Sequence, residues 1–243
     1  MHNAPLPQPV IIDRSGAVLT FTLNNADAGN EVTGPMFDAM IAALRSEATL
    51  PTARVLRIRA LGEVFCTGRE RAGNDAASIH REVSRLIELK RLLRASTLIT
   101  IAEVQGDAFG FGFGLAILCD LTLVSSSARL AFPEMRKGLP PAAIMAYLGR
   151  YALPKQVFPM VLFGDAVTPD AALNAGLVTR VCAPGSLRAE ADSLIDRILT
   201  LDDTSARQCK SFFQAAEESS LEHNFRCATE TLTVASLRLS ATK

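Results

Sequence analysis

The sequence predicts an α/β core followed by a helical C-terminal region. Short apolar and β-branched segments alternate with helical patterns as far as about Ala183, which is typical of helices packed on a sheet. From Ser186 onward the pattern is helical throughout, and Pro184-Gly185 breaks the chain between the two parts. The apolar residues are mainly aliphatic, since 49% of the chain is hydrophobic and only 6% is aromatic. We therefore expect a core of residues 1–183 and a helical region of residues 184–243.

The first expected elements are a hairpin, a helix and a strand. Val10 to Arg14 and Ala17 to Leu23 are apolar runs around the turn signal Ser15-Gly16. Thr33-Gly34-Pro35 can begin a helix, because a capping threonine and an early proline both suit a helix N-terminus. Arg54 to Ala60 alternates as a strand with one covered face does.

A long amphipathic helix is expected after the charged loop Gly62 to Asp75. Its predicted buried stripe consists of Ile79, Val83, Leu86, Ile87, Leu89 and Leu93. A buried strand, Leu98 to Val104, then leads to a glycine-rich run, and the next helical segment is Leu115 to Cys119. The remaining strands and helices expected in the core are Leu121–Ser125, Arg129–Phe132, Ile144–Leu148, Gln156–Leu162, Pro169–Ala175 and Val178–Val181.

The charge balance and the cysteines exclude several classes of protein. The 243 residues include 25 Lys plus Arg and 25 Asp plus Glu, so no overall field attracts nucleic acid. Five scattered cysteines and three histidines show no disulfide framework or metal-ligand spacing, so we expect no metal. Cys66 is expected to be a small buried residue rather than a nucleophile, because no catalytic histidine pattern accompanies it. The N-terminal residues do not look like a signal peptide and no apolar run reaches roughly 18 residues, so we expect a cytoplasmic protein without a membrane segment.

The glycine run, Gly106 to Gly114, lies where a strand ends and a helix begins. Free backbone N–H groups and the positive end of the helix dipole favour an anion at such a place. A dinucleotide site is not expected, because Leu115 stands where the spacing of Gly110 and Gly112 requires the last glycine. By itself the run either holds a phosphate or a developing oxyanion, or only lets the helix pack closely on the sheet.

A second loop at a strand end can act together with the glycine run. Gly62 to Glu70 follows the strand Arg54 to Ala60, so two strand-end loops could each direct a backbone N–H at one oxygen. Such a pair of donors would form an oxyanion hole.

An ordered set of motifs carries a family resemblance. The two loops are followed by Leu115 to Asp120, by Ala128 to Glu134 and by Gly176 to Val178. In this order the chain resembles the enoyl-CoA hydratase/isomerase, or crotonase, superfamily from about Val10 to Val181. The resemblance implies a crotonase-like (ClpP/crotonase) spiral of strand-strand-helix units and an enzyme acting on acyl-CoA, in which coenzyme A is part of the substrate and no separate cofactor is used. It also implies that the C-terminal helices build a homotrimer or a hexamer made of two trimers.

The resemblance assigns roles to particular residues. It implies that the backbone N–H groups of Arg69 and Phe111 hold the thioester oxygen while the acyl group becomes an enolate, and each such donor contributes about 2.7–4 kcal/mol. It makes Glu134, in the Pro-Glu pair, the acid/base. The residues that it places against the substrate are Thr67, Gly68, Glu70, Arg71, Ala72, Phe109, Gly110, Gly114 and Pro133.

The type of reaction depends on position 114. Relatives that add water carry a second glutamate at the position that Gly114 occupies here. Hydration uses paired carboxylates, whereas moving a double bond needs one base that takes a proton and returns it elsewhere. We therefore expect isomerisation ahead of hydration; Asp107 and Glu70 are either substitutes for the missing acid or plain loop charges. Hydrolysis, decarboxylation and a non-catalytic acyl-CoA binder are the alternatives.

The cations that hold CoA in the family are missing from their usual early segment, which here reads Asn24-Asn25-Ala26-Asp27-Ala28-Gly29-Asn30. Residues 45–94, in contrast, contain 11 basic and 6 acidic residues. We therefore expect Arg69 and Arg71 to attract the CoA phosphates or an acidic acyl end.

Overall fold

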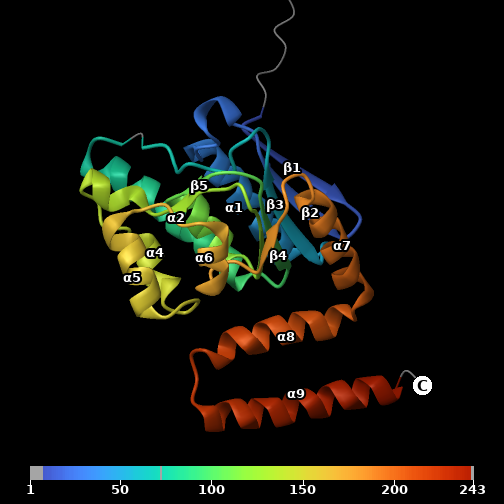
Figure 1. The fold of residues 1–243 in the computed structure, drawn as a ribbon. Helices are drawn as coiled ribbons and strands as arrows, with labels where there is room; N and C mark the ends of the chain where they lie inside the picture. The colour runs from blue at the N-terminus through green and yellow to red at the C-terminus, as the bar shows by residue number, and fades with distance from the viewer. Residues whose placement is uncertain (1–7, 72, 242–243) are drawn as a thin grey trace, which may run out of the picture. The chain divides into compact units, whose positions relative to one another are not determined.

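The computed structural model describes residues 8–71 and 73–241 (Figure 1). Its strands are β1 (Val10–Ser15), β2 (Val18–Leu23), β3 (Val55–Ala60), β4 (Ile99–Val104), β5 (Ala108–Phe109), β6 (Leu121–Ser125), β7 (Leu130–Ala131) and β8 (Arg180–Cys182). Its helices are η1 (Ala26–Ala28), α1 (Gly34–Thr49), α2 (Ala76–Ala95), α3 (Phe111–Leu118), η2 (Pro133–Lys137), α4 (Ala142–Leu148), α5 (Pro154–Phe163), α6 (Pro169–Asn174), α7 (Leu187–Thr200), α8 (Asp203–Ala216) and α9 (Leu221–Ala241). Ala72, a predicted substrate contact, lies outside the described residues.

A six-stranded sheet forms the centre of the core, in the order β1-β2-β3-β4-β6-β8. β1 and β2 form the predicted antiparallel hairpin, in which Ser15 pairs with Val18. From β2 onward neighbouring strands are parallel, and Phe21 of β2 pairs with Ile58 of β3, both fully buried. Because parallel neighbours end at the same edge of a sheet, the loops that follow β3 and β4 emerge together. This edge carries the candidate site.

The glycine run folds differently from its prediction. β5 lies inside the run and pairs in parallel with β7, and α3 begins at Phe111 rather than at Leu115. Gly110 precedes the helix with a φ of 51°, which glycine adopts without strain. A Cβ atom on Gly112 would stand 2.2 Å from the carbonyl oxygen of Cys66. Close packing therefore accounts for part of the run.

The buried stripe predicted for α2 is partly wrong. Leu86, Leu89 and Leu93 are buried as expected, whereas Ile79 and Val83 are 46% and 38% exposed. The two exposed side chains line a pocket beside the helix, so their apolar character serves that pocket rather than the core.

The Pro-Glu pair lies on a short rigid turn. Pro133 occupies the first turn of η2, where its missing N–H costs no hydrogen bond. Gly138 ends the turn with a φ of 70° and donates its N–H back into η2. The following helices α4, α5 and α6 confirm the predicted helical segments.

The chain divides into two compact units, one up to Asp196 and the other from Arg197. This division falls inside α7, later than the predicted boundary at Pro184-Gly185, because the first part of α7 belongs to the core. Asp192 of α7 accepts a hydrogen bond of 2.7 Å from Arg57, which also pairs with the buried Glu103.

The second unit consists of the end of α7 with α8 and α9, and α8 contacts α9. Arg238 of α9 donates a hydrogen bond of 2.6 Å to Asp202, which caps α8. None of the helices in the described parts of the chain has both the length and the hydropathy of a membrane-spanning segment.

Candidate active site

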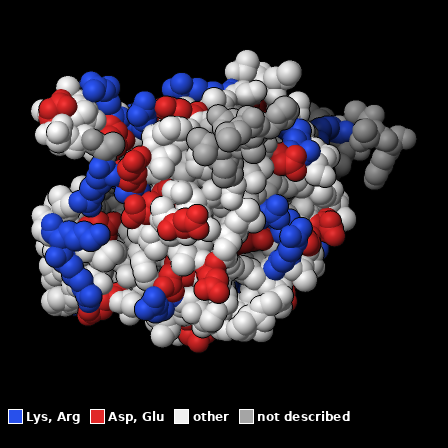
Figure 2. All heavy atoms as spheres, turned by 90° about the horizontal axis from the view of Figure 1, so that it is seen from above, with Lys and Arg blue, Asp and Glu red and all other residues white. Residues whose placement is uncertain are grey.

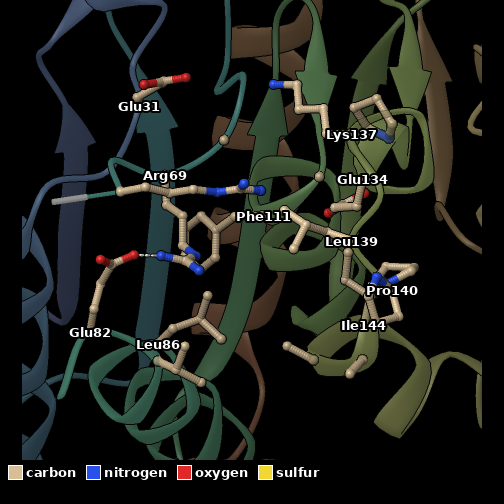
Figure 3. Close-up of a pocket in the computed structure, with 18 of the residues that line it drawn as sticks. Glu31, Arg69, Glu82, Leu86, Phe111, Glu134, Lys137, Leu139, Pro140 and Ile144 are labelled. Atoms are coloured by element: carbon tan, nitrogen blue, oxygen red, sulfur yellow. Dashed lines mark ion pairs between the residues drawn. The ribbon is translucent and has the colours of Figure 1, made fainter. Parts of the chain in front are cut away.

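A pocket of about 470 Å³ lies between the β3–α2 loop (residues 61–75), α2, the start of α3, η2 and the loop that enters α4 (Figure 3). In Figure 3, Glu31, Arg69 and Glu82 lie on one side of Phe111, and Glu134 and Lys137 lie on the other. The predicted site residues that line the pocket are Thr67, Gly68, Arg69, Arg71, Gly110, Phe111, Pro133 and Glu134. The edge of the sheet thus brings together most of the residues that the sequence assigned to one site.

Backbone hydrogen bonds hold the β3–α2 loop against the glycine run. The N–H of Cys66 donates to the carbonyl oxygen of Asp107 at 3.1 Å, and the carbonyl oxygen of Cys66 accepts from Phe109 at 2.9 Å. The N–H of Gly110 donates to the carbonyl oxygen of Ala131 at 2.9 Å. The segments before Arg69, before Phe111 and before Glu134 are therefore fixed in one place.

The β3–α2 loop leaves the N–H of Arg69 without an acceptor among the described residues. Val32 donates to the carbonyl oxygen of Gly68 at 3.1 Å and accepts from the N–H of Glu70 at 3.0 Å, so it pairs with both neighbours of Arg69. In such a parallel bridge the middle residue directs its own N–H to the opposite side. This N–H is available to a ligand.

The N–H of Phe111 is likewise available, because it belongs to the unpaired first turn of α3. Within the described residues Asn30 is the non-glycine residue with a positive φ, so Phe111 is accommodated without backbone strain. The side chain of Phe111 is buried and packs edge-on against Phe37, with ring centroids 5.2 Å apart. The two N–H groups that the family resemblance assigns to an oxyanion hole are thus both unpaired, and the assignment itself stays a prediction.

Glu134 places its carboxylate beside the start of α3. Oε1 lies 2.8 Å from the point where a Cβ atom on Gly110 would stand, and Oε2 is buried without a hydrogen-bond partner. Burial raises the pKa of Glu134, while Lys90, Arg71 and Lys137 act in the opposite direction. A carboxyl group with a raised pKa and an unsatisfied oxygen is suited to exchange a proton with a ligand in the pocket.

Gly114 does not line the pocket, contrary to its assignment as a substrate contact. A Cβ atom there would stand 2.6 Å from the hydroxyl of Tyr147 and 3.3 Å from Nζ of Lys90. These two side chains fill the space beside the glycine. Neither side chain was predicted from the sequence, although a lysine four residues after Leu86 on the apolar face of α2 was a local sign.

The side chain of Arg69 forms an ion pair with Glu82 of α2, which Figure 3 marks. Burial lowers the pKa of Arg69, and the neighbouring Arg71 adds to this effect. The guanidinium is therefore already engaged, whereas Arg71 is exposed at the pocket and forms no ion pair within the described part of the chain. Of the two arginines predicted to attract CoA phosphates, Arg71 therefore has the side chain that is more accessible to an anion.

Two other predicted contacts, Glu70 and Phe109, are not part of the pocket lining. Glu70 is exposed and Phe109 does not line the pocket; the guanidinium of Arg129 lies 5.8 Å from the ring centroid of Phe109. Asp107 forms an ion pair with Arg129, so it is a structural contact and not a substitute for a second acid. The site residues that the sequence analysis missed include Glu31, Glu82 and Lys137.

Cys66 is fully buried, and burial raises the pKa of its thiol to about 12. A thiol with this pKa stays protonated at neutral pH, and the thiolate is the nucleophilic form. The interpretation of Cys66 as a small buried residue is therefore confirmed.

Comparisons with known proteins place the chain in a family. The enoyl-CoA hydratase/isomerase family model matches residues 13–236. The 2,3-dehydroadipyl-CoA hydratase of Escherichia coli is 29% identical over 218 residues, which cover 86% of this chain and 80% of that protein. An enoyl-CoA hydratase structure from Mycobacterium smegmatis has a TM-score of 0.89 and 27% identity, and covers 94% of this chain and 91% of its own.

A structure from Thermobifida fusca, solved in complex with CoA, has a TM-score of 0.86 and 26% identity and covers 97% of this chain and 95% of its own. The fold predicted from the motif order is thereby confirmed as the crotonase fold. The family match and the fold similarity both extend along nearly the whole chain. The chain belongs to the enoyl-CoA hydratase/isomerase family and is an enzyme of the crotonase superfamily.

Proposed function

We propose that this enzyme moves the double bond of an enoyl-CoA by proton transfer through Glu134. The observation that carries the proposal is the buried, unpaired Oε2 of Glu134 beside the start of α3. The N–H groups of Arg69 and Phe111 have no acceptor among the described residues and would hold the thioester oxygen. The acyl group would lie in the 470 Å³ pocket between them.

The proposed reaction starts with a 3-enoyl thioester. The Glu134 carboxylate takes a proton from Cα, and the electrons of that C–H bond move onto the thioester oxygen, where the two N–H groups stabilise the dienolate. The protonated Glu134 then returns the proton to Cγ, which gives the conjugated 2-enoyl thioester. The chain supplies every acid and base in this scheme, so no cofactor is used beyond the coenzyme A of the substrate.

Hydration of a 2-enoyl-CoA is the second candidate. Its support is that matched relatives, such as the Escherichia coli protein and the (E)-benzylidenesuccinyl-CoA hydratase of Thauera aromatica, are named as hydratases. Both candidates use the same hole and the same glutamate, and they differ in whether a second group handles the proton of water.

The test is turnover of purified protein with 3-enoyl-CoA, followed by the absorbance of the conjugated product. We expect Glu134→Gln to lose at least about 100-fold in kcat, the lower limit for removing a general acid–base. Glu63→Gln, an exposed change in the β3–α2 loop outside the pocket lining, is the matched control. A Glu134→Gln variant that isomerises at the wild-type rate would show that another group is the base.

We also propose that the second unit assembles the chain into homotrimers or into hexamers of two trimers. Large apolar side chains are exposed on α8 and α9: Phe213, Leu221, Phe225, Leu232, Val234 and Leu237. A contiguous exposed apolar surface marks a site of protein association. Light scattering of the wild-type protein and of a Phe225→Asp variant tests this assembly, and a monomeric wild-type protein would contradict it.

A further inference from the structure

Lys90 is a buried lysine that lines the pocket and has no carboxylate hydrogen-bonded to it within the described residues. Its exposed fraction is 6%. Its Nζ donates a hydrogen bond of 2.8 Å to the hydroxyl of Tyr147 and lies 5.8 Å from the ring centroid of Phe111. An ammonium has three donors and an amine has a lone pair, so Nζ keeps hydrogen-bonding capacity that Tyr147 does not use.

Tyr147 fixes the position of this nitrogen. Its hydroxyl donates to the carbonyl oxygen of Gly114 at 2.7 Å and therefore accepts from Lys90 through a lone pair. Burial raises the pKa of Tyr147 well above its ordinary value, so the hydroxyl keeps its proton. The two hydrogen bonds therefore run in one direction, from Lys90 to Tyr147 and from Tyr147 to Gly114, and they hold Nζ beside the glycine run.

The position of Nζ matters because Gly114 stands where the resemblance places a second glutamate. The hydroxyl of Tyr147 and Nζ of Lys90 lie 2.6 Å and 3.3 Å from the point where a Cβ atom on Gly114 would stand. They occupy the volume that a side chain at position 114 would enter. An amine from α2 therefore lies beside the position of α3 at which the resemblance places a second acid.

We propose that Lys90, positioned by Tyr147, is a second proton-transfer residue that lets this enzyme add water to 2-enoyl thioesters. The proposal rests on the proposed roles of the Arg69 and Phe111 N–H groups and of Glu134. It adds an activity that Glu134 alone does not explain.

The proposed addition of water starts with both groups neutral, Lys90 as an amine and Glu134 as a carboxylic acid. The Lys90 amine takes a proton from water while the water oxygen bonds to Cβ, and the electrons of the double bond move onto the thioester oxygen as an enolate. Protonated Glu134 gives its proton to Cα, which yields the 3-hydroxyacyl thioester. Lys90 is left as an ammonium and Glu134 as a carboxylate, and the return of one proton from Lys90 to Glu134 restores both.

The electrostatics of the pocket support this exchange. Burial lowers the pKa of Lys90 to about 7, with the charge of Glu134 opposing the shift, and burial raises the pKa of Glu134. Both shifts favour the neutral forms. Among the described residues, the titratable groups found to act on Nζ are Glu134 from η2 and Tyr147 from α4, and Phe111 and Gly114 of α3 lie close to it. The charged contacts from α1 go to other residues of α2: Arg45 pairs with Glu88, and Asp38 with Arg85.

The experiment compares hydration of 2-enoyl-CoA with isomerisation of 3-enoyl-CoA in the wild-type enzyme, Lys90→Met and Tyr147→Phe. We expect Lys90→Met to lose at least about 100-fold in kcat of hydration and to lose clearly less in isomerisation, where Lys90 acts only through its charge near Glu134. The pH profile of hydration should be bell-shaped in the wild-type enzyme and have a single limb in Lys90→Met. Tyr147→Phe should retain both limbs with a smaller loss of kcat.

A further variant separates proton transfer from packing. Lys90→Ala opens space beside the pocket, and ethylamine in the buffer should restore part of its hydration activity but none of its isomerisation. Wild-type enzyme that hydrates no enoyl thioester, a Lys90→Met variant that keeps the bell-shaped profile, or equal loss of both reactions without amine rescue would each overturn the proposal. Failure of the isomerase proposal is a separate result, because it is decided by Glu134→Gln with 3-enoyl-CoA.

Discussion

Glu134 and Gly110 share one space: Oε1 of the glutamate lies 2.8 Å from the point where a Cβ atom on the glycine would stand. Gly110 also has a φ of 51°, a value that costs other residues about 1–3 kcal/mol. The glycine before α3 therefore provides both the backbone turn and the room for the carboxylate. This relationship leads to a prediction that separates backbone strain from loss of the acid/base.

Gly110→Ala should lower the free energy of unfolding by about 1–3 kcal/mol and also lower kcat by at least about 10-fold, because the new methyl group displaces the Glu134 carboxylate. Gly138→Ala is the matched control. Gly138 has a φ of 70°, but a Cβ atom there meets nothing within 4 Å. Urea unfolding and turnover of both variants provide the measurements, and an equal loss of kcat in both would contradict the role of the contact.

The two loops of the site could be predicted from the sequence because their strands are clear. β3 has an alternating pattern and β4 a mainly apolar one, and the ends of parallel neighbours lie at one edge of the sheet. The start of α3 at Phe111 could not be predicted, because glycine is a poor helix former and the helix is fixed by contacts that are distant in sequence. Gly112 against Cys66 is such a contact.

Side-chain partners were harder to predict than backbone positions. Lys90 and Tyr147 are 57 residues apart in sequence and meet beside Gly114 of α3 only after folding. The sequence shows that Gly114 replaces the second glutamate of the family, but it does not show which side chains fill the space beside this glycine. The pairing of Arg69 with Glu82 is similar, since a loop arginine gives no sequence signal of the helix residue that it contacts.

A second prediction concerns Glu47 of α1, a buried carboxylate that is not part of the pocket lining. Burial acts to raise its pKa, but hydrogen bonds from Arg14, Ala53 and Thr52 outweigh it, and the pKa is lowered from 4.5 to about 2. A carboxyl group with a lowered pKa in the folded state stabilises the fold above the unfolded pKa. This stabilisation is lost as the pH falls from about 4.5 to about 2.

Between about pH 4.5 and about pH 2, the free energy of unfolding of the wild-type protein should therefore fall by about 3 kcal/mol through the titration of Glu47. The Glu47→Gln variant should not show this loss. Urea unfolding at pH 6, 4 and 3 measures the difference between the two proteins. Asp165→Asn is the control, because Asp165 forms an exposed pair with Arg136, for which less than about 1 kcal/mol is expected. A constant difference between wild type and Glu47→Gln at all pH values would contradict the assignment.

The last prediction concerns how the anionic CoA moiety is attracted. Figure 2 shows Lys and Arg side chains interspersed with Asp and Glu over one face of the molecule, so attraction depends on where a particular cation lies. Arg71 is exposed and lines the pocket, and its charge acts on both Arg69 and Glu134. Arg69 is not suited to the same test, because its side chain pairs with Glu82.

Arg71→Glu should weaken binding of a CoA ester by about 3- to 10-fold at low salt and should reduce the dependence of Kd on salt, because a screened attraction becomes a repulsion. Arg81→Glu is the matched control: it makes the same charge change at an exposed position of α2 that is outside the pocket lining. Calorimetric titration at two salt concentrations distinguishes the variants. Equal weakening by both would mean that the overall charge of this half of the chain attracts CoA, whereas an effect of Arg71→Glu alone would locate the attraction at the mouth of the pocket.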